Sequence, residues 1–200
     1  TKASAFPMKT HPFAGYRQVL NEIYRRVLAG GAKTVLDIGF GTGTLTAKLY
    51  EQGCEIWGQD FSENMMALAK AKIPNARLFC GDFLLHLAEE LKRNRYDAIL
   101  ASYSLHHLTD VQKANPVNSL LPLLKEGGYI YICDVAFETR AVLERCRTLA
   151  GDEWDDEECY FIAEEFLKAL RARSSSAFPS APACLPCAHQ FISLKHRSRV

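Results

Sequence analysis

The sequence predicts an α/β fold, a doubly wound and mostly parallel sheet in three layers, and two observations carry this prediction. Short apolar runs such as Val35, Leu36 and Ile38 suit strands that are buried on both faces, as in a parallel sheet. Between these runs lie segments with apolar residues at helical spacing, of which residues 14–28 are the clearest. Strands that alternate with helices favour a parallel sheet covered by helices on both faces.

The individual elements follow from the same periodicities and from the residues that bound them. We expect strands over residues 35–38, 55–60, 76–80, 98–101 and 129–135. We expect helices over residues 14–28, 45–53, 65–72, 84–91, 141–149 and from 151 to about 171. Pro116 should break the helix that precedes the fifth strand, because proline removes a hydrogen bond from a helix interior.

The composition is that of one globular domain. The 200 residues are 48% hydrophobic and 24% charged, which is enough to bury a single sizeable core. The net charge of +1 argues against a protein whose whole surface binds nucleic acid. No apolar run reaches the length that a membrane span requires. The seven cysteines are odd in number and mostly scattered singly, which favours reduced thiols and a cytoplasmic protein.

The composition changes sharply near residue 171. We expect one domain over residues 1–171, in which residues 1–28 form a cover segment, and an atypical tail over residues 172–200. The tail is rich in serine, proline, alanine and basic residues, as in an altered C-terminus or a disordered extension. Its one plausible strand, residues 190–194, would leave the final hairpin of the sheet incomplete.

Two groups of candidate metal ligands are weak signals, and we predict no metal site. Cys184 and Cys187 form one close pair near His189 and His196, but a zinc site of this kind needs a second spaced pair. The acidic run over residues 152–158 has no fixed ligand spacing, and carboxylates are favoured in the first turn of a helix in any case.

The first strand runs directly into a glycine pattern, Asp37-x-Gly39-x-Gly41-x-Gly43. A strand, a glycine turn and a helix in succession let the backbone approach a ligand closely at the carboxyl end of a sheet. A dinucleotide fingerprint, G-x-G-x-x-G, would need its third glycine at the position of Thr44. The observed spacing instead resembles the first motif of class I S-adenosylmethionine-dependent methyltransferases.

The resemblance covers residues 14–170 and implies a Rossmann-like methyltransferase fold with S-adenosylmethionine as cofactor. It implies that the three glycines give the cofactor access to bare backbone and that Asp37 orders their loop. Asp60 ends the second strand about 20 residues later, where one carboxylate can accept hydrogen bonds from both ribose hydroxyls. Phe61 and Met65 follow, either as an apolar wall for the adenine or as ordinary core residues.

The third strand ends in Gly81-Asp82-Phe83, which extends the resemblance. In the family, an acidic residue at this place accepts the adenine amine, and neighbouring backbone frames the ring. The resemblance therefore implies that Gly81, Asp82 and Phe83 contact the adenine. Asp82 could also cap the helix expected over residues 84–91, and one carboxylate can do both.

The segment after the fourth strand resembles the family a third time, with the sequence Ser102-Tyr103-Ser104-Leu105-His106-His107-Leu108. The resemblance implies that Ser102, Leu105 and His106 lie nearest the transferring methyl group. Two adjacent histidines point in different directions, so at most one faces the site, and we select His106 as the candidate catalytic base. Asp134, near the end of the fifth strand, lines the substrate cavity or caps the next helix, and the cap is the favoured interpretation.

These features predict methyl transfer from S-adenosylmethionine to an unidentified small-molecule acceptor by a monomer or homodimer. We expect no membrane partner and no nucleic-acid partner, because no basic stripe carries interleaved aromatic residues. Two alternatives stay open. A nicotinamide-dependent oxidoreductase would share the strand, the turn and Asp60, and a catalytically silent module would bind the cofactor without methylating anything.

Overall fold

The structure, a computed structural model, describes residues 16–106, 108–156, 158–173, 183–184 and 189–195. Its strands are β1 (Thr34–Ile38), β2 (Glu55–Asp60), β3 (Arg77–Cys80), β4 (Tyr96–Ser102), β5 (Leu124–Phe137), β6 (Phe161–Ile162), β7 (Ala183–Cys184) and β8 (His189–Lys195). Its helices are α1 (Tyr16–Ala29), α2 (Thr44–Glu51), α3 (Glu63–Lys72), α4 (Glu89–Lys92), α5 (Asp110–Leu120), α6 (Arg140–Ala150) and α7 (Ala163–Arg173), with short 3₁₀ turns at Leu121–Leu123 and Gly151–Glu153.

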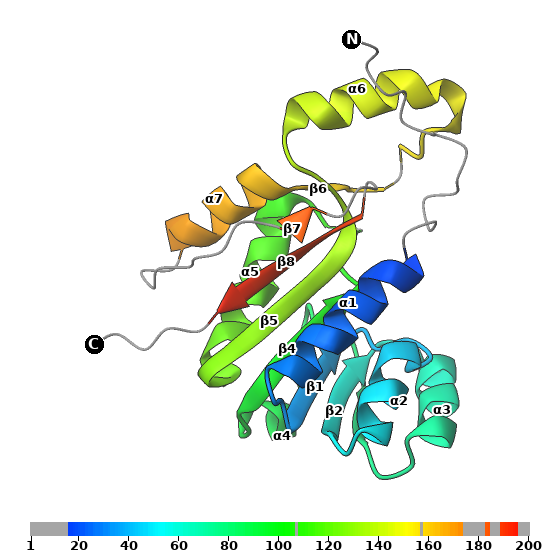
Figure 1. Cartoon of the computed structure of the whole chain (residues 1–200), viewed down its shortest axis with the longest axis vertical. Helices are drawn as coiled ribbons and strands as arrows, with labels where there is room; N and C mark the ends of the chain where they lie inside the picture. The colour runs from blue at the N-terminus through cyan, green and yellow to red at the C-terminus, as the bar shows by residue number, and fades with distance from the viewer. Residues whose placement is uncertain (1–15, 107, 157, 174–182, 185–188, 196–200) are drawn as a thin grey trace.

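The described strands form one eight-stranded sheet in the order β3-β2-β1-β4-β5-β8-β7, with β6 paired to β5 outside this path. The strands β1 to β5 pair in parallel, whereas β8 runs antiparallel to both β5 and β7. Figure 1 shows this twisted sheet running through the molecule with helices packed along it. The predicted mostly parallel α/β fold is therefore confirmed.

The sheet separates two hydrophobic cores, and neighbouring residues of one strand face different cores. Val35 of β1 packs in the core that contains Ile23 of α1, together with residues of α2 and α3. Leu36, the next residue, packs in the core that contains Val117 of α5 and Phe166 of α7. A strand alternates its side chains between two faces, so an apolar run is needed when helices cover both faces.

The carboxyl ends of the parallel strands meet at one edge of the sheet, and this edge positions the candidate site. β1 pairs with β2 on one side and with β4 on the other, so the chain moves away from β1 in opposite directions. Such a switch in strand order leaves a crevice between the loops that follow the neighbouring strands. The glycine loop follows β1 at this point.

The helix predicted over residues 84–91 is wrong. Only α4 is helical there, and residues 83–85 form a turn. The buried side chain of Gln59 bonds to backbone groups of this stretch, which satisfies them without a helix. Asp82 consequently caps no helix, since the residue that precedes α4 is Ala88.

The break predicted at Pro116 is also wrong, because α5 runs through this residue. Ala114 and Val117 on either side are buried in the core. Thr109 and Gln112 form a reciprocal capping box at the start of the helix. Burial and capping together offset the hydrogen bond that proline removes.

The long helix predicted from residue 151 begins only at Ala163. Phe161 and Ile162 instead form β6, which pairs in parallel with Ala136 and Phe137 at the end of β5. Both residues of β6 are buried, so tertiary packing overrides the helical periodicity of this stretch.

The strand predicted in the tail is confirmed as part of the sheet. β8 covers residues 190–194 and pairs with Tyr129 to Val135 of β5, and the two-residue β7 completes a short hairpin. Cys187 and His196 lie outside the described residues. Among the side chains that the structure describes, no three candidate metal ligands lie close enough together to hold an ion.

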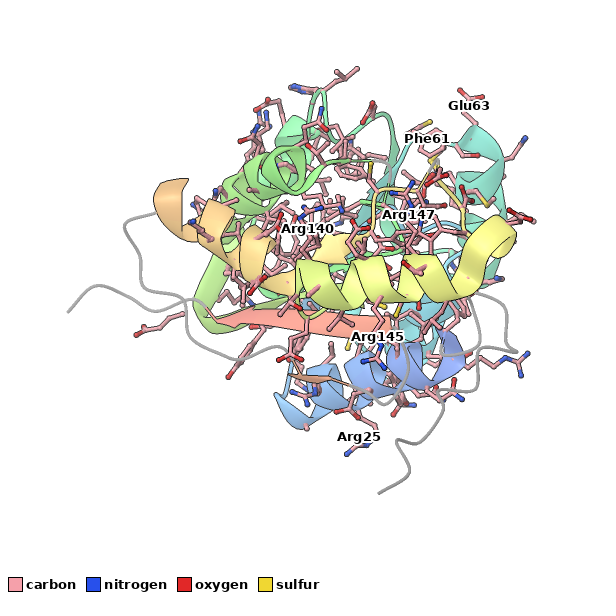
Figure 2. All side chains as sticks on the ribbon, turned by 90° about the horizontal axis from the view of Figure 1, so that it is seen from above. Arg25, Phe61, Glu63, Arg140, Arg145 and Arg147 are labelled. Atoms are coloured by element: carbon pink, nitrogen blue, oxygen red, sulfur yellow. The ribbon has the colours of Figure 1, made fainter. Side chains whose placement is uncertain are left out.

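Helix α6 has no buried residue, and two of its arginines form ion pairs with other parts of the chain. Figure 2 shows Arg140, Arg145 and Arg147 along this helix. Arg140 binds both carboxylate oxygens of Glu165 on α7, at 2.8 and 2.7 Å, and Arg147 binds Asp156 at 2.6 Å. Neither α6 nor any other helix in the described residues is long and apolar enough to cross a membrane.

Candidate functional site

The three glycines after β1 all have left-handed backbone, with φ of 70°, 55° and 71° at Gly39, Gly41 and Gly43. A Cβ at Gly39 would lie 2.4 Å from the Cβ of Ser104, and a Cβ at Gly43 would lie 3.2 Å from that of Ala69. Gly41 differs, since nothing lies within 4 Å of its Cβ position. Internal packing thus explains why positions 39 and 43 require glycine, whereas Gly41 presents bare backbone to open space.

Asp60 connects the end of β2 to this loop. Its Oδ2 accepts a hydrogen bond of 2.8 Å from the Gly41 N–H, and its Oδ1 accepts one of 2.9 Å from the Ser62 N–H. Its carbonyl accepts from the Gly81 N–H at 2.9 Å. The side chain is 4% exposed. Each carboxylate oxygen has a second lone pair, so the anchored group can still accept from a hydroxyl.

Asp37 lies beneath the glycine loop with one carboxylate oxygen unsatisfied. Oδ2 accepts a hydrogen bond of 2.5 Å from the Thr46 hydroxyl at the start of α2, while the buried Oδ1 has no hydrogen-bond partner among the described residues. Burial raises the pKa of Asp37 to about 7, the bond from Thr46 opposes this, and the charge of Asp60 adds to it. A cationic ligand group would satisfy Oδ1 and restore the charge.

Exposed apolar side chains flank the ends of β2 and β3. Phe61 is 75% exposed and Met65 is 39% exposed, so the core interpretation of both residues is wrong. Figure 2 shows Phe61 beside Glu63 at the first turn of α3. Asp82 is also exposed, and its Oδ1 accepts a hydrogen bond of 2.8 Å from Leu84 N–H. Phe83 is half-buried against the core on the α4 side.

The loop after β4 lies against the glycine loop. Tyr103 has a φ of 51°, its N–H donates to the Cys133 carbonyl at 2.8 Å, and its ring centre is 4.9 Å from that of Tyr16 in α1. Ser102 is half-buried, and its hydroxyl has no hydrogen-bond partner among the described residues. Leu105 is 2% exposed and belongs to the core beneath α5.

His106 faces a buried carboxylate. Its Nδ1 lies 3.6 Å from Asp134 Oδ2, which is an ion-pair distance, and the two side chains are 23% and 2% exposed. Asp134 raises the pKa of His106 above its ordinary 6.5, burial opposes this, and Glu158 adds a smaller upward contribution. Thr139 caps α6, so the favoured interpretation of Asp134 as a cap is wrong. Sequence spacing could not pair His106 with Asp134, because the contact joins the ends of two strands.

A buried lysine holds a neighbouring segment against the His106 loop. The Cys159 N–H donates to the His106 carbonyl at 2.8 Å. Lys113 of α5 is fully buried, and its ammonium donates to the Cys159 carbonyl at 2.6 Å. The same ammonium lies 3.8 Å from the ring centre of Phe161, a cation–π contact. The backbone of His106 is therefore held by the Cys159 peptide, which Lys113 holds in turn.

Comparison with known proteins agrees with this geometry. Residues 35–128 match the family model described as a methyltransferase domain. An uncharacterized methyltransferase of Anoxybacillus flavithermus is 36% identical over 132 residues, which are 66% of this chain and 59% of that protein. One of Geobacillus kaustophilus is 34% identical over 165 residues, which are 79% of this chain and 74% of that protein. The chain spans about three fifths of the length of the first of these relatives.

The chain belongs to the class I S-adenosylmethionine-dependent methyltransferase family. Among solved structures, magnesium protoporphyrin IX methyltransferase from Synechocystis PCC 6803 with bound S-adenosylhomocysteine superimposes with a TM-score of 0.72. It is 16% identical, and the match covers 98% of this chain and 90% of that one, which shows the shared fold. The family predicted from the glycine motif is confirmed.

In this methyltransferase, most of the predicted site residues come together at one edge of the sheet. Sequence reasoning missed Gln59, and it offered Asp134 as a cavity-lining residue or a helix cap without its contact to His106. Their sequence signals were a polar residue inside a buried strand and an acid at a strand's carboxyl end. The second histidine, His107, lies outside the described residues.

Proposed function

We propose that this methyltransferase binds S-adenosylmethionine across the loop at Gly41 and transfers its methyl group to a small-molecule acceptor. The observation that carries the proposal is the anchored Asp60 carboxylate, which lies beside the one loop glycine whose Cβ position is open. A carboxylate and bare backbone side by side suit a ribose and the chain attached to it.

The residues at this edge fit the cofactor. The unsatisfied Oδ1 of Asp37 would take the ammonium of the methionine part, and Asp60 would hold the ribose. Asp82 would accept the adenine amine, and the exposed Phe61 and Met65 would cover the ring. When bound, the cofactor supplies an activated methyl group whose leaving group departs as a neutral thioether. The protein has to align the acceptor and exclude water.

His106 is the residue that we assign as general base. Because its Nδ1 faces Asp134, Nε2 is the ring nitrogen that would receive the proton. An acceptor hydroxyl would lose its proton to this nitrogen as the new bond to carbon forms, and an ammonium would lose its proton before its nitrogen attacks the methyl carbon. Asp134 would then stabilise the imidazolium, because an opposite charge in a buried setting favours the protonated form. The peptide of Cys159 holds the His106 backbone in place.

The nature of the acceptor and the setting of the protein are parts of the same proposal. A small molecule is favoured over nucleic acid because the net charge is only +1. The five cysteines whose side chains are described form no disulfide, which supports a cytoplasmic protein. We propose a monomer or a homodimer, which the elution volume on size-exclusion chromatography would distinguish.

Calorimetric titration of the chain with S-adenosylhomocysteine and, separately, with NADH tests the proposed cofactor. We expect S-adenosylhomocysteine to bind and NADH not to bind, and the reverse result would support the oxidoreductase alternative. Incubation with S-adenosylmethionine and a panel of metabolites tests the reaction. Release of S-adenosylhomocysteine with one acceptor is expected, whereas binding without any turnover would indicate the catalytically silent module.

A further inference from the structure

Gln59 is a buried amide whose hydrogen bonds all go to one loop. It lies in β2 with 2% exposure, one residue before Asp60. Its Nε2 donates to the His86 carbonyl at 2.8 Å and to the Gly81 carbonyl at 3.2 Å. Its Oε1 accepts from the Ala88 N–H at 2.9 Å. One side chain thus bonds to both ends of the stretch between β3 and α4.

Only an amide of this length can make these three bonds. Two of the partners are carbonyls that need a donor, and the third is an N–H that needs an acceptor. A glutamate would set its charge against the two carbonyls, and a methionine would satisfy none of the three groups. The fit is close, because a Cβ at Gly81 would lie 3.3 Å from the Gln59 amide nitrogen.

Gln59 and Asp60 hold two sides of the same crevice. Successive side chains of a strand point to opposite faces of the sheet. Asp60 reaches the Gly41 N–H on the face with α2 and α3, and Gln59 reaches the stretch before α4 on the other face. That stretch carries Asp82 and Phe83 at its beginning.

We propose that Gln59 is the positioning residue for adenine recognition. It holds residues 81–88 in a non-helical loop and thereby sets where the Asp82 carboxylate and the adjacent backbone stand. This inference rests on the proposed function, which places the adenine at Asp82. Gln59 does not touch the cofactor and acts through the loop.

The variant Gln59→Met tests the proposal with two measurements. In the cofactor-free protein, we expect the Ala88 amide to lose protection from hydrogen exchange, because its acceptor, the Gln59 Oε1, is gone. In calorimetry, we expect the affinity for S-adenosylhomocysteine to fall about tenfold or more. We expect a smaller loss for S-inosylhomocysteine, which carries an oxygen in place of the adenine amine, so the preference for the adenine compound shrinks.

Two further variants keep the test decisive. Ala88→Pro removes the N–H that bonds to Gln59 and leaves Gln59 itself intact, and the Ala88 φ of −53° suits proline. Ala88→Pro should lower the affinity for S-adenosylhomocysteine a few fold and that for S-inosylhomocysteine less. This measurement remains possible even if Gln59→Met does not fold. Gln52→Met is the control, since Gln52 is exposed at the end of α2 and should change neither measurement.

The outcomes separate this inference from the proposed function. An unchanged preference for the adenine compound in both Gln59→Met and Ala88→Pro overturns the positioning role, even if overall stability falls. Unchanged protection of Ala88 in Gln59→Met overturns the hydrogen-bond assignment. If the unaltered protein binds neither compound, the proposed cofactor site fails and the adenine role fails with it, whereas the exchange result still decides whether Gln59 orders the loop.

Discussion

The Asp60 carboxylate accepts a hydrogen bond of 2.8 Å from the backbone N–H of Gly41, 19 residues earlier in the chain. This contact joins the ends of two parallel strands and fixes the open glycine beside an anchored acid. Asp60 is 4% exposed, so the acid is held in one orientation before any ligand arrives. Such preorganisation reduces the entropy that binding would otherwise cost.

Gly41→Ala should impair cofactor binding, whereas its cost in stability should match that of a control glycine elsewhere. The left-handed φ of 55° costs an alanine about 1–2 kcal/mol, and the new methyl group would occupy the space in which the ligand approaches the backbone. We expect the affinity for S-adenosylhomocysteine to fall at least about tenfold by calorimetry. Gly53→Ala is the matched control, since Gly53 has a φ of 82° and equally open surroundings away from the site. Equal effects of the two variants on binding would contradict the role of Gly41.

Asp60→Asn should weaken cofactor binding by about tenfold to a hundredfold and change turnover at saturation little. The amide keeps one acceptor oxygen but loses the charge, and bonds to charged groups contribute roughly 1.5–3 kcal/mol. A ribose contact is made equally in the ground state and the transition state, so the loss should appear in KM. Asp152→Asn, at an exposed position, serves as the control. A fall in kcat with unchanged KM would argue against a ribose contact.

The pH dependence of His106 should depend on Asp134. Asp134 raises the pKa of His106, so a base at this position becomes active only as the pH rises above 6.5 and the imidazole loses its proton. In Asp134→Asn the pKa should fall, and the rising limb of the rate should move to lower pH. NMR titration of the His106 ring protons measures the shift without a known acceptor. An identical titration curve in Asp134→Asn would show that the pair is not coupled.

Asp37→Asn should stabilise the protein at high pH, provided no ligand is bound. Burial raises the pKa of Asp37 from 3.8 to about 7, so the folded protein holds a proton that the unfolded chain releases between these values. The free energy of unfolding of the unaltered protein should therefore fall relative to that of Asp37→Asn as the pH rises from 4 to 7. The difference is at most roughly 4 kcal/mol, because each pKa unit corresponds to about 1.4 kcal/mol. Urea denaturation at pH 4.5 and pH 8 measures it, and parallel pH dependence of the two proteins would contradict the buried-acid assignment.

Some of the site could be predicted because its signals are local. The glycine pattern, the strand before it and the helix after it occupy one stretch from Thr34 to Glu51. The three glycines of this stretch are needed for its left-handed backbone. Asp60 could be predicted from its place at a strand end. The contact of Asp134 with His106 has no such signal, because an acid after a strand serves as well for a helix cap.

The errors have a common physical cause. The stretch over residues 84–91 has helical character in sequence, but its backbone groups at His86 and Ala88 form hydrogen bonds with the side chain of Gln59 on β2. Pro116 is tolerated because buried neighbours hold α5 together, and β6 forms because β5 offers it a partner. In each case, contacts distant in sequence outweigh a local preference, which is about 1 kcal/mol or less for an ordinary residue and about 3 kcal/mol for a proline inside a helix.

The sequence by itself determined the parallel α/β architecture, the glycine loop and the acid that stands beside it, since period, glycine spacing and strand ends are properties of short stretches. Only the tertiary structure decided which glycine is open, which carboxylate faces His106, and which side chain holds the loop at Asp82. These are matters of distance between segments far apart in the chain. Such distances are set when the sheet brings the ends of its strands together, and no local pattern encodes them.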